Sequence, residues 1–188
     1  MTGSLDGKRI AFLVANSGVE QVELTTPWAA VQDAGGTPVL IAPEKDDVQA
    51  MNGSANKGDT FTPDDSLDAV NPADFDALVL PGGVANPDKL RVIPAAVDFA
   101  KSFALTGKPI AAICHGPWTL VEAGVLVGKT LTSWPSLRTD ICNAGGTWVD
   151  SEVEVSPANG WTLVTSRKPD DLDAFVRTFT EVFASAGN

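Results

Sequence analysis

Residues 108–120 constrain the fold of this chain more strongly than any other stretch. The apolar run at 110–113, which follows a glycine–lysine–proline breaker, has the length and composition of a short strand buried on both faces. Gly116 and a following proline then open a segment with helical spacing, which ends at Gly124. Cys114 is therefore expected at the corner between a buried strand and a helix.

A corner of this kind makes a nucleophile elbow. The turn is tight, so the residues two before and two after the nucleophile must be small, as Ala112 and Gly116 are. The N–H groups of the following helix favour the thiolate form of Cys114. The alternative is a buried cysteine that only fills space, which is common. The adjacent His115 favours a functional thiol, and because it is the only histidine, any Cys–His chemistry must use it, from this subunit or a neighbouring one.

Composition limits the size, partners and location of the protein. The length of 188 residues and mass of 19.6 kDa predict one domain over residues 1–188. A net charge of −11 argues against nucleic acid and anionic membrane as partners. Two cysteines and one histidine indicate no zinc site and no disulfide framework. Residues 1–8 hold no apolar signal region, so we expect a cytoplasmic protein. We expect no metal and no cofactor.

Strand-like apolar runs alternate with amphipathic helical segments along the chain. Strands are expected at residues 9–14, 37–42, 75–80, 110–113, 126–132, 147–149, 153–155 and 162–165, the last two at the edge of the sheet. Helices are expected at residues 20–34, 93–105 and 117–123 and from Pro169 onward, with a loop at 15–19 and small antiparallel strands within 43–74. The alternation predicts a flavodoxin-like three-layer α/β/α sandwich with a mostly parallel sheet.

In such a fold the loops after residues 14, 80 and 113 meet at one edge of the sheet, where ligands bind. A carboxyl group touching the thiol would orient it and tune its pKa, although acidic residues in a first helical turn also simply compensate the helix dipole. Glycines after a strand let the backbone approach a ligand closely. The side chains and glycines that these loops carry are Glu20, Glu23, Gly82, Gly83, Cys114 and His115.

Several motifs, in this order and at this spacing, make the chain resemble the ThiJ/PfpI family of intracellular proteases and stress proteins. The motifs are Ala15-Asn16, Val22-Glu23-Leu24, Ala77-Leu78-Val79-Leu80-Pro81-Gly82-Gly83, Gly107-Lys108-Pro109, Ala112-Ile113-Cys114-His115-Gly116-Pro117, Thr132-Ser133-Trp134-Pro135, Asn143-Ala144-Gly145 and Trp148-Val149-Asp150. The resemblance covers nearly the whole chain. It implies the same flavodoxin-like fold and a homodimer or a higher homo-oligomer.

The resemblance also implies roles for single residues. Cys114 matches the nucleophile, Glu23 the carboxylic acid that hydrogen-bonds to it, and Glu20 a second acid nearby. His115 matches a histidine that pairs with an acidic residue from the adjacent subunit. That acid corresponds to Asp88, where the archaeal protease-type members carry glutamate.

The resemblance further implies an oxyanion hole and a pocket wall. The backbone N–H groups of Gly83 and His115, next to Gly82, would form the oxyanion hole. Trp134 replaces a tyrosine common in the family motif; it either lines the pocket or belongs to the core.

Two classes of function follow. In the first, the protein is a cysteine hydrolase that acts on a carbonyl group, either as a peptidase or as a deglycase or glyoxalase acting on aldehydes and their adducts with proteins. In the second, it is a non-catalytic stress protein that senses oxidants through Cys114 or holds unfolding proteins. Glutamine amidotransferase chemistry is set aside, since no histidine follows His115. Cys142, in an apolar context, is expected to be structural.

Overall fold

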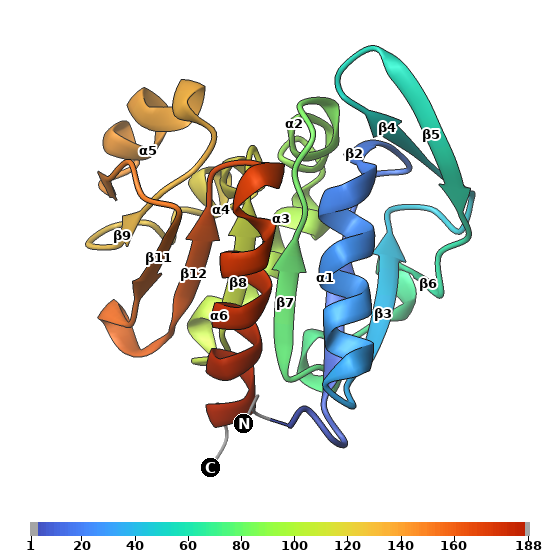
Figure 1. Ribbon diagram of the computed structural model, residues 1–188, viewed down its shortest axis with the longest axis horizontal. Helices are drawn as coiled ribbons and strands as arrows, with labels where there is room; N and C mark the ends of the chain where they lie inside the picture. The colour runs from blue at the N-terminus through green and yellow to red at the C-terminus, as the bar shows by residue number, and fades with distance from the viewer. Residues whose placement is uncertain (1–3, 187–188) are drawn as a thin grey trace.

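The computed structural model describes residues 4–186. Its centre is a seven-stranded sheet (Figure 1). All neighbouring strands are parallel except the pair at one edge, β11 and β12. The strands, from that edge to the other, are β11 (Val153–Ser156), β12 (Leu163–Ser166), β8 (Ile110–Ile113), β7 (Ala77–Leu80), β1 (Arg9–Leu13), β3 (Thr37–Ala42) and β6 (Asp65–Ser66). The predicted flavodoxin-like architecture is confirmed.

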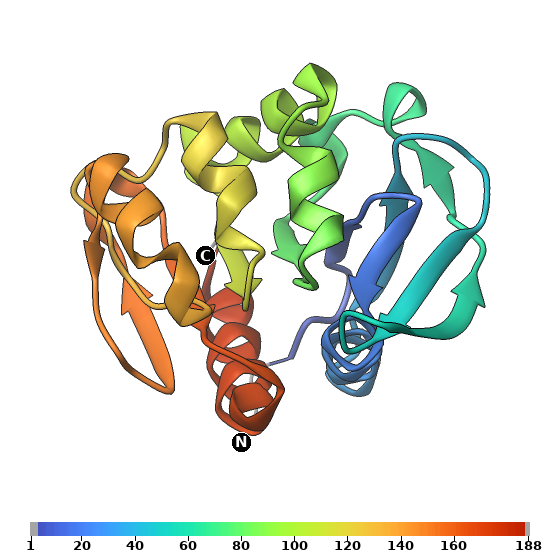
Figure 2. The same ribbon diagram turned by 90° about the horizontal axis from the view of Figure 1, so that it is seen from above.

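Helices cover both faces of the sheet, which gives the three layers. One face packs against α1 (Gln21–Asp33) and α6 (Leu172–Ser185), and the other against α3 (Pro94–Leu105) and α4 (Pro117–Ala123) (Figures 1 and 2). Because successive side chains of a strand point to opposite faces, Phe12 joins the core that contains the phenylalanines of α6. The side chain of Leu13 joins the core under α3. This double burial explains why the central strands are continuous apolar runs.

Smaller elements surround the carboxyl edge of the sheet. A three-stranded sheet combines β2 (Ser17–Glu20), β4 (Val48–Asn52) and β5 (Asn56–Phe61), and a two-stranded one pairs β9 (Thr130–Leu131) with β10 (Thr147–Trp148). Two short helices complete the fold, α2 (Ala85–Leu90) and α5 (Arg138–Asn143), together with 3-10 turns at Leu67–Ala69, Pro72–Asp74, Pro135–Leu137, Ala158–Gly160 and Pro169–Asp171.

Several local expectations were wrong. The expected loop at 15–19 contains β2, because its backbone pairs with β4. The helix α2 was missed, because six residues with a proline in the middle show no helical periodicity. The strand β12, expected at the edge, lies inside the sheet between β8 and β11, and its side chains are accordingly all buried.

Two further sequence expectations concern α6 and Cys142. The final helix begins at Leu172, since Pro169 opens a separate 3-10 turn before it. The expectation of a structural Cys142 is also wrong, because the short helix α5 exposes its thiol to solvent. No helix within residues 4–186 has both the length and the apolar character that a membrane span requires.

The corner between β8 and α4 depends on a glycine for steric reasons. Gly116 has ordinary helical angles, but a Cβ atom there would overlap the carbonyl oxygen of Leu80 and lie 2.9 Å from that of Ile113. Gly124, at the other end of α4, has a φ of 68° and open space around it. A side chain at position 116 is therefore excluded by steric contact, whereas one at position 124 is disfavoured only by the backbone conformation.

We expect Gly116→Ala to lower the free energy of unfolding by roughly 2 to 4 kcal/mol, because backbone oxygens of two strands must move. Gly124→Ala is the matched control and should cost only about 1 kcal/mol. Urea denaturation of both variants measures the difference. Equal losses would show that the elbow is not tightly packed.

Candidate active site

Cys114 occupies a strained backbone conformation at the corner that follows β8. Its φ of 60° lies in the left-handed region, which non-glycine residues seldom adopt. Two long-range hydrogen bonds hold it: its N–H donates to Ser166 O at 3.0 Å, and its carbonyl accepts from Trp134 N at 2.9 Å. The flanking segments therefore fix the direction in which the thiol projects.

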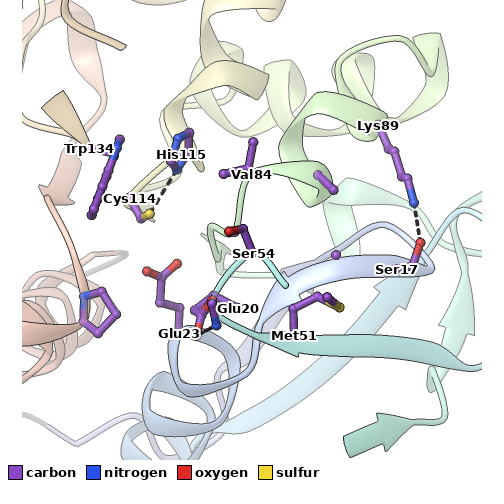
Figure 3. A pocket seen from close by; sticks show the side chains of 15 residues that line it. Ser17, Glu20, Glu23, Met51, Ser54, Val84, Lys89, Cys114, His115 and Trp134 are labelled. Atoms are coloured by element: carbon purple, nitrogen blue, oxygen red, sulfur yellow. Dashed lines mark hydrogen bonds between the residues drawn. The ribbon is translucent and has the colours of Figure 1, made fainter. Parts of the chain in front are cut away.

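The thiol lines a cavity of about 710 Å³ above the carboxyl edge of the sheet (Figure 3). The walls come from β2 and the start of α1, the hairpin between β4 and β5, the loop after β7, the elbow, and the segment that carries Trp134. Cys114 itself is 6% exposed. A volume of this size is typical of sites for drug-sized ligands.

The carboxyl group of Glu23 is fully buried and points toward Cys114 (Figure 3). Its Oε2 accepts a hydrogen bond from Gly82 N at 2.8 Å, whereas its Oε1 has no geometric hydrogen-bond partner among the described residues. Burial raises the pKa of Glu23 to about 8, and the charge of Glu20 acts in the same direction. The neighbouring Cys114 thiol and the N–H of Gly82 oppose this shift only in part. Glu23 is therefore mostly protonated at neutral pH.

The pKa of the Cys114 thiol is also raised, first by burial and then by the charge of Glu23. The backbone N–H groups of Gly83 and His115 act in the opposite direction, because they favour negative charge on the sulfur. The two acidic groups thus compete for one negative charge. At neutral pH the pair is mainly uncharged, and its first proton leaves near pH 8.

His115 places its Nδ1 atom 3.1 Å from Cys114 Sγ. Burial lowers the pKa of His115 to about 4, so the imidazole is neutral at pH 7 and has a nitrogen available to accept a proton. Its ring stacks on Trp134, with centroids 5.7 Å apart and an angle of 22°, and meets the edge of Trp118 at 5.2 Å. Trp118 is anchored by a 2.7 Å hydrogen bond from its Nε1 to Asp140. The imidazole is thereby held in place by aromatic packing.

The two glycines after β7, Gly82 and Gly83, lie so close to neighbouring atoms that any side chain at these positions would clash. A Cβ on Gly82 would lie 2.7 Å from Cys114 Cβ, and Gly83 has a φ of 81° with Glu20 N 2.8 Å from its Cβ position. The backbone N–H of Gly83 consequently reaches the region of the sulfur.

Asn86 supports this loop and was missed in the sequence. Its side chain is fully buried, and its Oδ1 accepts from Ala15 N at 2.7 Å. Its Nδ2 donates to the carbonyl oxygens of Pro81 and Gly82, both at 3.0 Å. Asn86 therefore ties the loop after β7 to the loop after β1. A buried asparagine in a short helix leaves no periodic signal that could have revealed this.

The structure places the remaining predicted residues differently. Trp134 lines the cavity with 39% of its surface exposed. Glu20 also lines it, but its carboxylate accepts from Gly53 N at 3.0 and 3.1 Å. Asp88 is exposed on α2 and does not belong to the described residues that line the cavity. One chain alone therefore brings together Cys114, His115, Glu23, Glu20, Gly83 and Trp134, but not Asp88.

The profile of the DJ-1/PfpI family matches residues 8–182. The chain belongs to the DJ-1/PfpI family. Two relatives in this family are Deglycase PfpI of Pyrococcus furiosus, 41% identical over 93% of this chain and 98% of its own length, and General stress protein 18 of Bacillus subtilis, 44% identical over 91% of this chain and 95% of its own. The crystal structure of Drosophila melanogaster DJ-1beta superposes with a TM-score of 0.81 at 30% identity, covering 94% of this chain and 90% of that one. The DJ-1/PfpI fold thus extends over almost the entire chain.

The raised pKa of Glu23 predicts how stability depends on pH. The folded protein holds the Glu23 proton more tightly than the unfolded chain, whose carboxyl has a pKa near 4.5. This contribution is therefore complete below pH 4.5 and is lost as the pH rises toward 8, by roughly 3 to 5 kcal/mol.

Glu23→Gln removes the ionisable group, so we expect the variant to gain stability relative to wild type between pH 5 and pH 8. Urea denaturation at the two pH values measures this gain. Glu181→Gln, on the exposed side of α6, is the control and should show no such gain. A gain of the same size in both variants would contradict the assignment to Glu23.

Proposed function

We propose that this protein is a cysteine-dependent hydrolase that acts on carbonyl groups, with aldehyde adducts of amines and thiols as its main substrates. The observation that carries the proposal is the thiol of Cys114, which lines a large cavity between a buried carboxyl group and a neutral imidazole. These are the parts that nucleophilic catalysis by cysteine requires.

The first step is activation of the thiol. The Sγ proton moves over the 3.1 Å contact to Nδ1 of His115, while protonated Glu23 stabilises the sulfur by hydrogen bonding. The thiolate then adds to the substrate carbonyl, and the π electrons of the C=O bond become the lone pair of an oxyanion. The N–H groups of Gly83 and His115, which already favour negative charge at this place, stabilise that oxygen.

Two kinds of substrate then lead to a thioester on Cys114. With an amide, the tetrahedral adduct expels the amine, which takes its proton from His115. With an adduct of a 2-oxoaldehyde, the C–N or C–S bond to the carrier breaks first, and the proton of the adduct's hydroxyl goes to the departing amine or thiol, which frees the aldehyde. Cys114 adds to C1 of that aldehyde to give a hemithioacetal; transfer of its C1 proton to C2 through an enediol turns it into a thioester of a 2-hydroxy acid. Water hydrolyses the thioester in both cases and restores the thiol.

Aldehyde substrates are favoured because relatives 41% identical to this chain are named deglycases. A non-catalytic role in oxidant sensing is the second candidate. It is supported by a thiol next to a carboxyl group, and a 44% identical relative bears the name of a general stress protein.

His115 needs an acidic partner to become a strong base, because burial keeps its pKa low. We propose that Asp88 of a second subunit supplies it in a homodimer or higher oligomer. Two observations support this: Asp88 is exposed on α2, and α2 carries Lys89 at the wall of the same cavity.

We expect Cys114→Ala to abolish the consumption of methylglyoxal and its adducts, a loss of at least about a thousandfold, because no other group can form the thioester. Wild type and variant are assayed in parallel on methylglyoxal, on its adduct with N-acetyllysine, and on fluorogenic peptides. Equal rates for wild type and Cys114→Ala would contradict the proposal that the protein is a cysteine-dependent hydrolase. Peroxide-dependent protection of cells without any turnover would support the sensor.

A mixing experiment tests the shared site. Cys114→Ala and Asp88→Asn should each be nearly inactive when expressed alone. Co-expression forms mixed dimers in which one site has both Cys114 and the neighbour's Asp88, so activity should recover to roughly a quarter of wild type. If the mixture shows only the sum of the two variants, Asp88 does not act across an interface.

A further inference from the structure

The cavity has two chemically different ends (Figure 3). Cys114, His115 and Trp134 lie at one end, and Ser17 and Lys89 lie at the other. At the reactive end Glu23 is mostly protonated and the imidazole is neutral at neutral pH, and the charge of Glu20 acts on Glu23 from beside it. The far end carries an ammonium group. A substrate that fills the cavity therefore meets a nucleophile and a cation at opposite ends.

Lys89 is held at this far end by the elements on each side of it. It extends from α2, and its Nζ donates a hydrogen bond to the hydroxyl of Ser17 on β2. That bond uses one of the three N–H donors of the ammonium group. No carboxylate within residues 4–186 lies at salt-bridge distance from it. Lys89 is exposed and lines the cavity, so its other donors are available to an anion there.

The electrostatic setting makes this cation distinctive. The protein carries a net charge of −11, yet Lys89 is the only lysine or arginine among the described residues that line the cavity. The other formal charge on the wall is Glu20, whose carboxylate oxygens both accept from Gly53 N. Glu20 keeps its negative charge and lies beside Glu23, so Lys89 is the group on the wall that attracts an anion.

The size of the cavity points to a substrate larger than a free small aldehyde. A volume of about 710 Å³ suits a drug-sized molecule, of which a three-carbon aldehyde is only a part. The carrier of the aldehyde, an amino acid or peptide, therefore has room within the cavity.

We infer that Lys89, with Ser17, forms a subsite for a carboxylate on the carrier. This inference rests on the proposed function: the favoured substrate is an aldehyde adduct whose carbonyl meets Cys114 and whose carboxylate meets Lys89. An exposed charge pair of this kind discriminates by about three- to fivefold. Lys89 is a specificity-determining residue and takes no part in bond breaking.

The test compares two probes that differ only in charge. S-(2-hydroxypropyl)-N-acetylcysteine carries the carboxylate, and its amide is the neutral match; both are stable thioethers. Calorimetric titration of wild type should show binding of the carboxylate form about three- to fivefold more tightly. In Lys89→Gln the ratio of the two Kd values should fall to about one. Lys101→Gln, which makes the same charge change on α3 away from the cavity, should keep the wild-type ratio.

Three results would overturn the inference: no preference in wild type, a preference that persists in Lys89→Gln, or an equal loss in Lys101→Gln. The hemithioacetals of methylglyoxal with N-acetylcysteine and with its amide are assayed separately for turnover. If neither hemithioacetal is consumed while the Kd ratio depends on Lys89, the proposed function fails and the carboxylate subsite stands. If both are consumed but the ratio does not depend on Lys89, the subsite fails and the hydrolase stands.

Discussion

The left-handed backbone of Cys114 is the constraint on which the rest of the site depends. A non-glycine residue at a φ of 60° costs about 1 to 3 kcal/mol, so its surroundings must hold it there. The end of β12 accepts its N–H, and the segment of Trp134 donates to its carbonyl. The bare backbone of Gly116 lets α4 start at once. Every group that meets the thiol is positioned relative to this corner.

Burial determines the chemistry of the three titratable groups at that corner. It raises the pKa of Glu23 and of Cys114 and lowers that of His115, so each group favours its neutral form. Under the proposed function, a substrate or a neighbouring charge has to make one of the charged forms favourable before the thiol can react. The backbone N–H groups of Gly83 and His115 provide part of that bias on the sulfur side. Glu23 and His115 are therefore mainly uncharged at neutral pH.

The elements outside the central sheet give the cavity its shape. The hairpin of β4 and β5 is tied to the start of α1 through Glu20 and Gln21, which bond to Gly53 and Asp59. Asn86 links the loop after β1, which leads into β2, to the loop after β7, which contains Gly82 and Gly83. These contacts join a reactive end made by the sheet to a basic end made by α2. Under the proposed function, the first end carries the chemistry and the second selects the carrier.

Much of the molecule could be predicted from the sequence because the signals were local. Apolar runs indicated the buried strands, and a cysteine between small residues indicated the elbow. Gly82 and Gly83 follow directly after a strand. Glu23 and His115 were found through their place after such strands and through resemblance. Contacts between distant segments left no such signal.

Only the tertiary structure decided the interior place of β12, the exposure of Cys142, the bond of Glu20 to Gly53, the support from Asn86 and the position of Lys89. Each of these depends on which segments meet in space. The sequence by itself determined the central strands, the helices that cover them and the place of Cys114 at the elbow, since neighbouring residues along the chain are enough to specify them. The charges, partners and shape of the cavity arise from residues far apart in the chain, and packing alone brings those together.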